Sequence, residues 1–514
     1  MALTTIPAVG QYGIVADTLP QELPLGAWSA GTNVRFIDGA AERVGGHVAA
    51  FTTPTVTPYY VAPYTTSTAR FWIHAGLARV FCDDGTTKTD ITNATPYTGA
   101  IDNRWTGGSF NGVLLLNNGK DQPQFWGGSI ATPLAPVTGW DATWTCNALR
   151  PFKNYIFALG MVKGGVAYPN MVKWSTECAP GTITASGGWD ISNPAIDAGE
   201  VDLAETPDII VDALPMGDQF IIYKERSTYS CQYIGQPEIF QFRKLPSAFG
   251  MLARGCAVDT PVGHIVLTAG DLVVHQGLAA TSLLEGKWRK LLFTSIDSVN
   301  YARSFLAVNP RKNEVWVCYP DVGQASCTSA LIYNWLTGAV GQRQLPKATY
   351  GNTGQINLTG GDAWSSDSFT WAQTSGSWGQ NEYSANEGRL VLSSTEPNII
   401  LVDTSVQFES VNINASLERT GMAFDTPGMV KLIRSVTPRI DAPMGTVLQI
   451  QVCGAMDTES APIWSAPVTY TVGTTRKADC IAAGRFLGVR ITSSSAQGWR
   501  IHSLDVDVAV AGAY

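Results

Sequence analysis

The feature that most constrains the fold of this chain is a strand-turn-strand unit that returns along its length with aromatic residues and glycine-containing turns. In residues 102–119, an apolar run of strand length at 113–116 ends in the turn Asn117-Asn118-Gly119, which is the pattern of one arm of a β-hairpin. Units that start about every 40 residues, each with several short strands, are typical of β-propeller blades. The other units occupy residues 70–92, 149–175, 209–235, 255–277, 302–343 and 389–404.

The length of the chain and its strand patterns predict how it divides into domains. With 514 residues it exceeds the roughly 250 to 300 residues at which a single core stops growing. We predict an N-terminal arm and hairpin over 1–58, β-propeller blades over 59–404, and a C-terminal β-sandwich-like domain over 405–514. The last part equally fits a final blade with extensions. Long amphipathic helical patterns are absent, and residues 278–284 have room for one or two helical turns at most, so the predicted fold class is all-β.

Local patterns place strands in the two flanking parts. Residues 34–37, Asp38-Gly39 and residues 40–44 predict a strand, a type I′ turn and a returning strand. Alternation over 500–510 predicts one core face and one solvent face. The first face would carry Ile501, Ser503, Asp505 and Asp507, with the two carboxylates in solvent, and the second would carry His502, Leu504, Val506 and Val508. Further strands are expected over 405–417, 430–440, 446–452, 468–472 and 486–492.

The sequence lacks the residue patterns of an active site or a metal site. Its five His show no H-x-x-x-H or H-E-x-x-H spacing, and His74 and His264 lie in strand patterns, where we expect hydrogen-bonded structural histidines. No G-x-S-x-G, Walker A or G-x-G-x-x-G motif occurs. Asp83-Asp84-Gly85 is similar to the Asp-box turn of sialidases but lacks its leading Ser and closing Trp, so we interpret it as a hairpin turn. We therefore expect no catalytic residue, cofactor or metal.

Cysteine usage and charge narrow the class of protein further. The nine Cys are scattered without a C-x-x-C pair, which argues against a zinc site and a disulfide framework and favours synthesis in a reducing cytoplasm. The N-terminus lacks a secretory signal pattern, and no run of about 18 apolar residues predicts a membrane-spanning helix. The formal net charge of −8 disfavours nonspecific binding to the nucleic acid backbone.

One stretch near the N-terminus carries a family resemblance. Its pattern consists of Trp28, Asn33, Arg35, Phe36, Asp38, Gly39, Arg43, Gly45 and Gly46. This pattern resembles the N-terminal signature of tail nozzle proteins, also called tail-hub or DNA-stabilisation proteins, of short-tailed bacteriophages. Three further stretches are similar to the same family and follow in the same order: 149–159 with 172–175, 315–320 with 331–335, and 484–490 with 499–507.

The resemblance implies a structural, non-enzymatic virion protein. It implies a β-propeller protomer that forms a homo-oligomeric ring, expected to be hexameric, below the portal and the head-to-tail adaptor proteins. Tail fibres or spikes would be further partners. The ring would surround the exit channel, hold packaged genomic DNA until ejection, and let the DNA pass without sequence-specific binding. Assembly in the host cytoplasm and a final location in the virion tail follow from the same resemblance, and the signature residues are expected to be structural.

The sequence leaves two other hypotheses of function open. A glycan-binding or glycan-cleaving tail protein for host-surface recognition is favoured by Trp364, Trp371 and Trp378, because clustered indole rings stack on sugars. A cellular propeller that serves as an interaction platform is the third reading. It lacks support because the Gly-His and Trp-Asp dipeptides of the common repeat family do not recur at repeating positions.

Overall fold

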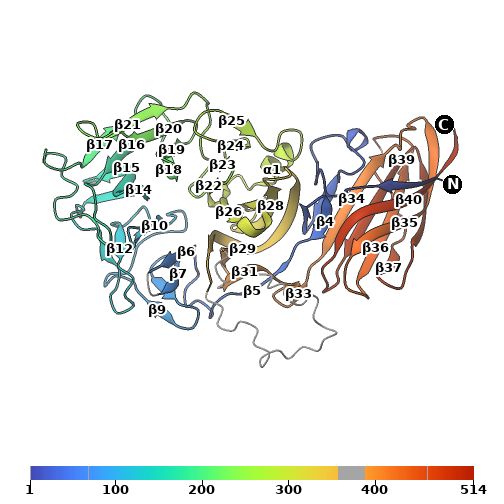
Figure 1. The fold of residues 1–514 in the computed structure, drawn as a ribbon, viewed down its shortest axis with the longest axis horizontal. Helices are drawn as coiled ribbons and strands as arrows, with labels where there is room; N and C mark the ends of the chain where they lie inside the picture. The colour runs from blue at the N-terminus through green and yellow to red at the C-terminus, as the bar shows by residue number, and fades with distance from the viewer. Residues whose placement is uncertain (1, 67–68, 357–387, 397, 460, 514) are drawn as a thin grey trace.

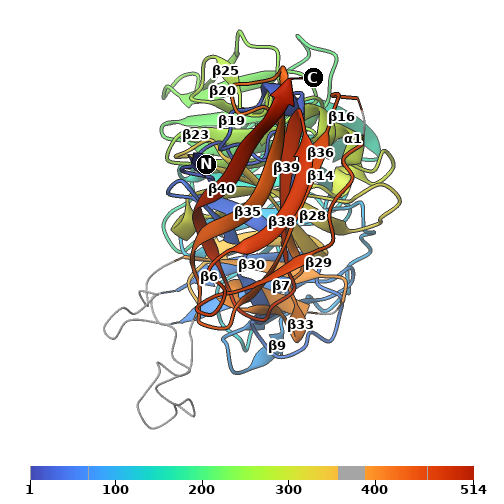
Figure 2. The ribbon, with the colours of Figure 1, turned by 90° about the vertical axis from the view of Figure 1, so that its right-hand side faces the viewer.

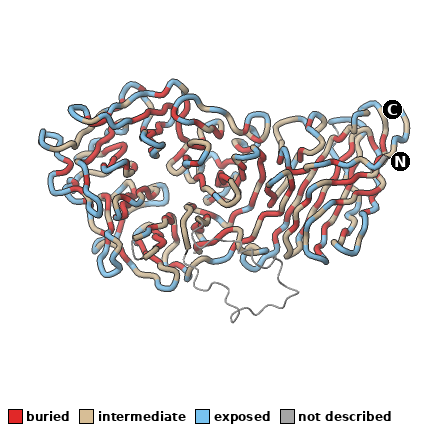
Figure 3. Tube along the Cα trace, in the orientation of Figure 1, coloured by how far each residue is buried: buried red, intermediate tan, exposed pale blue. Residues whose placement is uncertain are grey.

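The protein consists of a ring of small β-sheets joined side by side to a two-layer β-sandwich (Figure 1). The structure is a computed structural model that describes every residue except 1, 67–68, 357–387, 397, 460 and 514. Buried residues follow the strands of both parts, and exposed residues gather in the turns between them (Figure 3). The prediction of an all-β chain built on a propeller is confirmed.

The first five blades are separate four-stranded antiparallel sheets. Blade 1 holds β6 (Tyr60–Thr65), β7 (Arg70–Ala75), β8 (Val80–Asp83) and β9 (Lys88–Asp90). Blade 2 holds β10 (Thr106–Phe110), β11 (Val113–Asn117), β12 (Gln124–Trp126) and β13 (Ala135–Pro136). Blade 3 holds β14 (Trp144–Phe152), β15 (Tyr155–Lys163), β16 (Val166–Trp174) and β17 (Gly199–Asp202). Blade 4 holds β18 (Ile210–Met216), β19 (Gln219–Lys224), β20 (Thr228–Tyr233) and β21 (Phe240–Lys244). Blade 5 holds β22 (Ala257–Thr260), β23 (Gly263–Leu267), β24 (Leu272–His275) and β25 (Ala280–Ser282).

Blades 6 and 7 share one long strand, β29 (Val340–Gly354). Its first half is the outer strand of blade 6, beside β28, and its second half pairs with β30 as the inner strand of blade 7. Blade 6 also holds β26 (Phe305–Asn309), β27 (Glu314–Tyr319) and β28 (Cys327–Asn334), and blade 7 also holds β30 (Arg389–Ser394), β31 (Asn398–Ser405) and β5 (Gly46–Ala49). The described residues therefore form seven four-stranded blades, and a strand from the start of the chain completes the last one. Each repeat unit of the sequence falls in a different blade.

The sandwich combines strands from both ends of the chain (Figure 2). One sheet holds β2 (Ala30–Thr32), β34 (Ala415–Met422), β39 (Phe486–Ser493), β36 (Val447–Ala455) and β37 (Val468–Thr471). The facing sheet holds β1 (Ala2–Ile6), β4 (Ala40–Arg43), β40 (Arg500–Ala513), β35 (Met429–Asp441) and β38 (Ala478–Gly484). Leu417 and Val489 of the first sheet share a buried apolar cluster with Val436 and Val506 of the second, so the sandwich core lies between the two layers.

A hairpin joins the propeller to the sandwich. Strand β3 (Val34–Ile37) pairs with β29 of blade 6 through Val34 and Gln342, and its partner β4 pairs with β40 of the sandwich. The hairpin turn at Asp38 and Gly39 has φ of 50° and 74°, which are the two positive values that a type I′ turn requires, so this prediction is confirmed. One hydrogen-bonded sheet consequently runs from blade 6 through β3 and β4 into the sandwich.

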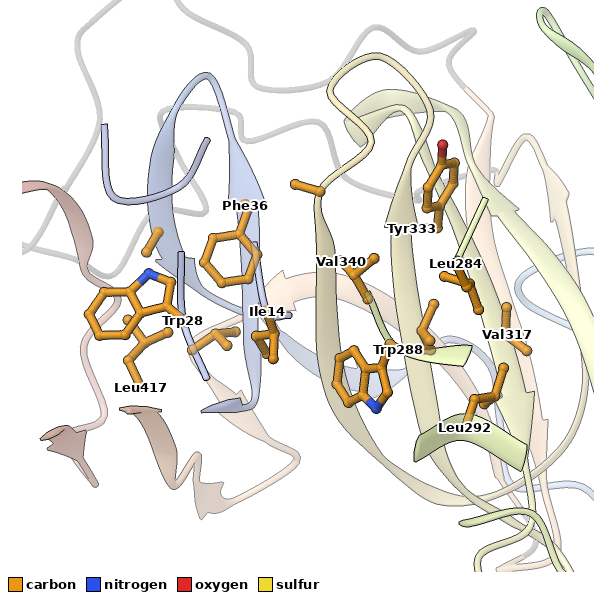
Figure 4. Packing of buried hydrophobic residues seen from close by; sticks show 14 of the residues in the cluster. Ile14, Trp28, Phe36, Leu284, Trp288, Leu292, Val317, Tyr333, Val340 and Leu417 are labelled. Atoms are coloured by element: carbon orange, nitrogen blue, oxygen red, sulfur yellow. The ribbon is translucent and has the colours of Figure 1, made fainter. Parts of the chain in front are cut away.

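Apolar side chains of the N-terminal segment fill the space between the two bodies (Figure 4). Trp28 lies against Leu417 of the sandwich, and Ile14 points toward Val340 of blade 6. These residues, together with Phe36, belong to a single buried cluster that extends into both parts of the molecule. The packing excludes water from the joint, and the hydrophobic effect therefore opposes separation of the propeller from the sandwich.

The short helix lies later in the chain than predicted. Residues 278–284 form no helix: they contain β25, and the α-helix α1 spans Arg289–Ser295. The carboxylate of Asp17 accepts hydrogen bonds from the backbone N–H groups of Lys290 and Leu291 at 2.7 and 3.2 Å. This cap comes from a distant part of the chain, so a local pattern does not reveal it. The remaining short elements are η1 (Pro20–Glu22), η2 (Tyr301–Arg303), η3 (Pro310–Lys312), β32 (Gln407–Phe408) and β33 (Val411–Asn412).

The predicted faces of β40 are wrong at its start. Arg439 and Ile440 of β35 pair with Ser503 and Ile501, so His502 has no partner across the ladder. This bulge shifts the alternation by one residue, and Ile501 is buried on the same side as Leu504 while His502 is exposed. Strand β38 was not predicted because its small residues give only a weak strand signal.

The N-terminal closure of blade 7 predicts unequal effects of two truncations. A chain that starts at residue 51 lacks β1 to β5, so blade 7 and the sandwich both keep unpaired strands, and we expect loss of cooperative thermal unfolding. A chain that lacks only residues 1–6 loses β1, which covers part of β40, and should keep a cooperative transition at a lower Tm. Differential scanning calorimetry would compare the two. Cooperative unfolding of the chain that starts at residue 51, at the Tm of the full-length protein, would contradict the closure of blade 7 by β5.

Candidate functional site

The signature residues come together at the joint between the propeller and the sandwich. Trp28 is buried and its indole Nε1 donates to the backbone oxygen of Val9 at 2.5 Å. Phe36 is buried in the cluster that spans both bodies. Asp38 lies in the β3–β4 turn, where its carboxylate is 3.1 Å from Arg500 of β40. Each of these residues therefore supports the N-terminal segment rather than forming an open site.

Two polar signature residues bond the N-terminal segment to distant strands. Asn33, with φ of 56°, donates to Gln344 of blade 6 at 2.9 Å and to the backbone oxygen of Asn414 at 2.8 Å. Arg43 donates to the backbone oxygens of Ser495 at 2.8 Å and Val406 at 2.9 Å. Burial lowers the pKa of Arg43 to about 10. These side chains satisfy main-chain acceptors that the joint would otherwise bury without partners.

A group of charged side chains, which we call the junction charge cluster, lies where the N-terminal strands meet blades 6 and 7; four of its five members are buried and the side chain of Asp403 is 12% exposed. It consists of Arg35 (β3), His47 (β5), Glu314 (β27), Arg343 (β29) and Asp403 (β31). Arg35 donates to both carboxylate oxygens of Asp403 and lies 3.4 Å from Glu314. Arg343 lies 3.2 Å from Asp403 and donates to Nδ1 of His47 at 3.3 Å. The cluster therefore ties the N-terminal strands to blades 6 and 7.

Aromatic rings enclose the second guanidinium of this cluster. Arg343 lies over Trp316 at 4.9 Å and over Phe408 at 5.0 Å from the ring centroids. His47 stacks on the same Phe408 ring with a centroid separation of 4.8 Å. A delocalised, weakly hydrated guanidinium suits such a position better than an ammonium group.

Burial and neighbouring charges set the protonation states of the cluster. Burial raises the pKa of Asp403, but the charges of Arg35 and Arg343 outweigh it, so this pKa lies well below its usual range. Burial raises the pKa of Glu314 to about 7, although Arg35 acts against the shift. Burial and the charge of Arg343 lower the pKa of His47 to about 3. Glu314 is thus the member whose charge changes near neutral pH, and its Oε1 has no hydrogen-bond partner among the described residues.

The two signature glycines allow a close approach of backbone segments. A Cβ on Gly45 would lie 2.8 Å from Oδ1 of Asp403, and a Cβ on Gly46 would lie 1.9 Å from the backbone oxygen of Gln407. Side chains at these positions would therefore push β5 away from the junction charge cluster and from the strand that it pairs with.

Arginine side chains cross the propeller axis. Arg254, before blade 5, donates to the backbone oxygens of Arg104 at 3.1 Å and Asn147 at 2.8 Å, in blades 2 and 3. Arg104 in turn donates to the backbone oxygen of Ser304, before blade 6, at 2.6 Å. Arg150 forms a two-point ion pair with the buried Asp212. These contacts join opposite blades of the ring through side chains and backbone oxygens near the starts of blades 2, 3, 5 and 6.

The histidine predictions hold at one position and fail at the other. His264 donates from Nε2 to the backbone oxygen of Pro215 at 2.9 Å and accepts from Tyr223 at 2.7 Å, and Tyr223 also bonds His275 at 2.8 Å. His74 is buried and stacks on Phe81, yet neither of its ring nitrogens has a partner among the described residues. Burial lowers the pKa of His74 to about 4, so the ring is neutral and acts as an aromatic core residue.

The carboxylates singled out in the sequence have structural partners. Asp84 accepts hydrogen bonds from the backbone N–H groups of Thr86 and Thr87 in the β8–β9 turn, so the hairpin-turn interpretation is confirmed. The solvent assignment of Asp505 is wrong, because β1 covers it: Asp505 is 8% exposed and accepts from Thr5 at 2.6 Å. Asp507 is paired with an arginine of β35 at 2.7 Å.

The part of the chain that the structure describes offers few other sites for chemistry. It contains no group of three or more His, Cys, Asp or Glu side chains that could hold a metal ion. Its one α-helix and three 3-10 helices are too short to cross a bilayer. All nine cysteines are free and buried. Trp364, Trp371 and Trp378, on which the glycan reading depends, lie outside the described residues.

The sequence signature includes one residue of the junction charge cluster, Arg35, but not its carboxylate partners. Arg35 is a signature residue, whereas Glu314 and Asp403 follow it at separations of 279 and 368 positions and belong to no motif. The only local signal is a single carboxylate within an apolar strand, as in Glu314-Val-Trp-Val. A buried carboxylate of this kind requires a cationic partner, but the pattern does not identify which one.

Comparisons with known proteins return propeller structures only at low similarity. No family model matches the sequence, and no curated protein matches it either. The WD40 β-propeller domain of Doa1 aligns with a TM-score of 0.37 at 10% identity, over 70% of this chain and 97% of that one. The AfRom2 CNH domain gives 0.35 at 8% identity, over 70% and 97%. BBS1N, solved in complex with ARL6DN, gives 0.38 at 9% identity, over 70% and 95%. At this level the likenesses carry no information on function.

Titration of Glu314 predicts a pH-dependent stability. Its pKa is raised from 4.5 to about 7 in the folded protein, so its contribution is complete below pH 4.5 and is lost as the pH rises through 7. We expect the free energy of unfolding of the wild type, relative to Glu314→Gln, to fall by about 3 kcal/mol between pH 4.5 and 8. Urea unfolding of both proteins across this range measures it. Parallel pH profiles for the wild type and Glu314→Gln would refute the raised pKa of Glu314.

Asp403→Asn should destabilise the protein by about 3 to 5 kcal/mol at pH 7, because it leaves the buried guanidiniums of Arg35 and Arg343 without this charged partner.

The close approach at Gly46 predicts a steric effect. Gly46→Ala places a Cβ against the backbone of Gln407 and should destabilise the protein by about 1 to 3 kcal/mol. Gly127→Ala is the matched control, because a Cβ there meets no heavy atom within 4 Å, and its Tm should stay within about 1 °C of the wild type. Thermal unfolding of the two variants compares them. Equal transition temperatures would show that β5 is able to move away without cost.

Proposed function

We propose that this protein is a structural, non-enzymatic component of a short-tailed phage tail. In this role it forms the nozzle ring at the distal DNA exit and retains packaged DNA until ejection. The observation that carries the proposal is the use of the signature residues: each lies in the joint where the N-terminal segment binds the propeller to the sandwich. The resemblance of these residues to the tail nozzle signature thus concerns the part of the molecule that sets the shape of the protomer.

A rigid joint suits the wall of a pressurised channel. Main-chain hydrogen bonds continue from blade 6 through β3 and β4 into β40, and the junction charge cluster ties β3 to blades 6 and 7. A motion of β3 away from blades 6 and 7 would have to break this ladder and separate Arg35 from Asp403 and Glu314, at a cost of several kcal/mol. In the proposed ring, a joint of this kind would resist bending between the propeller and the sandwich.

Contacts between opposite blades favour a DNA path between subunits in the proposed ring. Since Arg254 and Arg104 bridge opposite blades, the channel of a ring would be enclosed by several copies of the chain and not by one propeller. The formal net charge of −8 suits a lumen that DNA leaves quickly, because few phosphates would be neutralised.

The proposal includes the assembly and its surroundings. The chain would form a homo-oligomeric ring, hexameric by the resemblance, that binds the head-to-tail adaptor proteins on one side and meets tail fibres or spikes at its periphery. Genomic DNA would pass through the lumen without sequence-specific contacts. Assembly would take place in the host cytoplasm, and the mature location would be the virion tail.

Mass and symmetry test this proposal directly. Light scattering and negative-stain images of the purified protein, alone and with portal and adaptor proteins, should reveal a ring with a central hole. Asp84→Ala, in the β8–β9 turn of blade 1, is a control variant and should assemble as the wild type does. A compact monomer or trimer that ignores the adaptor and binds host polysaccharide would refute the nozzle and favour the glycan-directed tail protein.

A further inference from the structure

A continuous chain of hydrogen bonds links blade 4 to blade 5 through two buried histidines. Tyr223 of β19 lies between His264 of β23 and His275 of β24, with its hydroxyl 2.7 Å from Nδ1 of His264 and 2.8 Å from Nε2 of His275. The two histidines are direct partners in the β23–β24 ladder. All three side chains are at most 2% exposed. Tyr223 is therefore the member from blade 4, and it joins this histidine–tyrosine network to blade 5.

The outer contacts of the network fix the position of each ring hydrogen. Nε2 of His264 lies 2.9 Å from the backbone oxygen of Pro215, which can only accept, so this nitrogen carries the hydrogen. The backbone N–H of Gly277 donates to Nδ1 of His275 at 3.2 Å, so in the neutral ring Nε2 of His275 carries the hydrogen. His275 consequently donates to Tyr223, and Tyr223 donates to His264. Each donor in the network meets one acceptor.

A further proton cannot enter the network without the loss of a hydrogen bond. On Nδ1 of His264 it would face the hydroxyl of Tyr223, which would have to turn its own hydrogen away. Among the described residues the two histidines are the only hydrogen-bond partners of this hydroxyl, so the turned hydrogen would meet no acceptor. On Nδ1 of His275 the proton would face the N–H of Gly277, and two donors repel each other. Either position leaves a buried polar group unpaired, which costs free energy.

The charged groups near the network do not offset this cost. Asp259 of β22 lies 3.8 Å from Nε2 of His264, but its side chain is 68% exposed, so water screens it. Asp212 of β18 is the other carboxylate near Tyr223, and it is already held in an ion pair. Burial lowers the pKa of His275 to about 4, and the neighbouring His264 acts in the same direction. Burial also lowers the pKa of His264.

We propose that this network is an acid-sensitive latch: uptake of one proton breaks the link through Tyr223 and loosens the packing of blade 4 on blade 5. Phe249, whose ring centroid lies 4.7 Å from that of His275, would then become open to water. An opened network would bind the proton with the ordinary histidine pKa of 6.5, so the latch is complete above this pH and weakens as the pH falls below it. The latch lies within one protomer, so its test and the test of ring formation can fail separately.

Hydrogen exchange of the full chain tests the latch. It is followed by mass spectrometry at pH 7 and pH 5 and corrected for the intrinsic pH dependence of amide exchange. We expect the protection of β19, β23 and β24 to be at least about tenfold lower at pH 5, because each unit of pKa difference between the closed and opened network changes the opening equilibrium tenfold. Strands β14 and β15 of blade 3 are the internal reference and should keep their protection. Equal protection of β19, β23 and β24 at both pH values would overturn the proposal.

Two variants and one control assign the effect to the network. The double variant His264→Gln with His275→Gln has no group that titrates in this range and should exchange equally at pH 7 and pH 5. Tyr223→Phe lacks the linking hydroxyl and should show lowered protection of β23 and β24 already at pH 7. His74→Phe removes another buried histidine, whose pKa burial lowers to about 4, and as the matched control it should keep the wild-type response. A wild-type response in the double variant would refute the latch. If the double variant fails to fold, Tyr223→Phe decides, and wild-type protection in it at pH 7 would refute the latch equally.

Discussion

Strand pairing by the first fifty residues is the constraint on which the rest of the structure depends. A propeller blade and a sandwich sheet each leave unpaired N–H and C=O groups at an edge unless another strand covers them. Here β5 completes blade 7, β3 covers the outer edge of blade 6, and β1, β2 and β4 complete the sandwich. The same segment therefore finishes both bodies, and neither body is complete without it.

The charges buried in this joint specify its geometry more than they strengthen it. Removing two charges from water costs several kcal/mol for each, and the attraction between them recovers that cost only when the geometry is good. Arg35 and Asp403 meet this condition with a two-point contact, whereas Glu314 keeps one oxygen without a partner. A displaced β3 would leave Asp403 and Arg343 buried with fewer partners, so the cluster selects one position of the N-terminal hairpin.

The sequence predicts the repeating blades well because their signals are local. Turn glycines and short apolar runs fix each hairpin, and the Asp38-Gly39 turn follows from two residues. The joint is harder to predict because its contacts are distant in the chain: nothing near Arg35 points to Asp403, and nothing near Lys290 points to its cap, Asp17. The bulge at His502 shows the same limit within one strand, because the partner strand decides where the alternation shifts.

The order in which the strands are made adds a consequence for synthesis. Strand β5 leaves the ribosome early, yet its partner β31 lies some 350 residues later in the chain, where Ser405 pairs with Gly46. Chains with such distant contacts fold slowly. Strand β5 therefore stays without its partner strand in blade 7 until most of the chain has been translated. A prematurely terminated chain cannot close blade 7 and keeps exposed strand edges that proteases and chaperones recognise. Closure of blade 7 by β5 thus restricts entry into an assembly to chains in which β31 has been made.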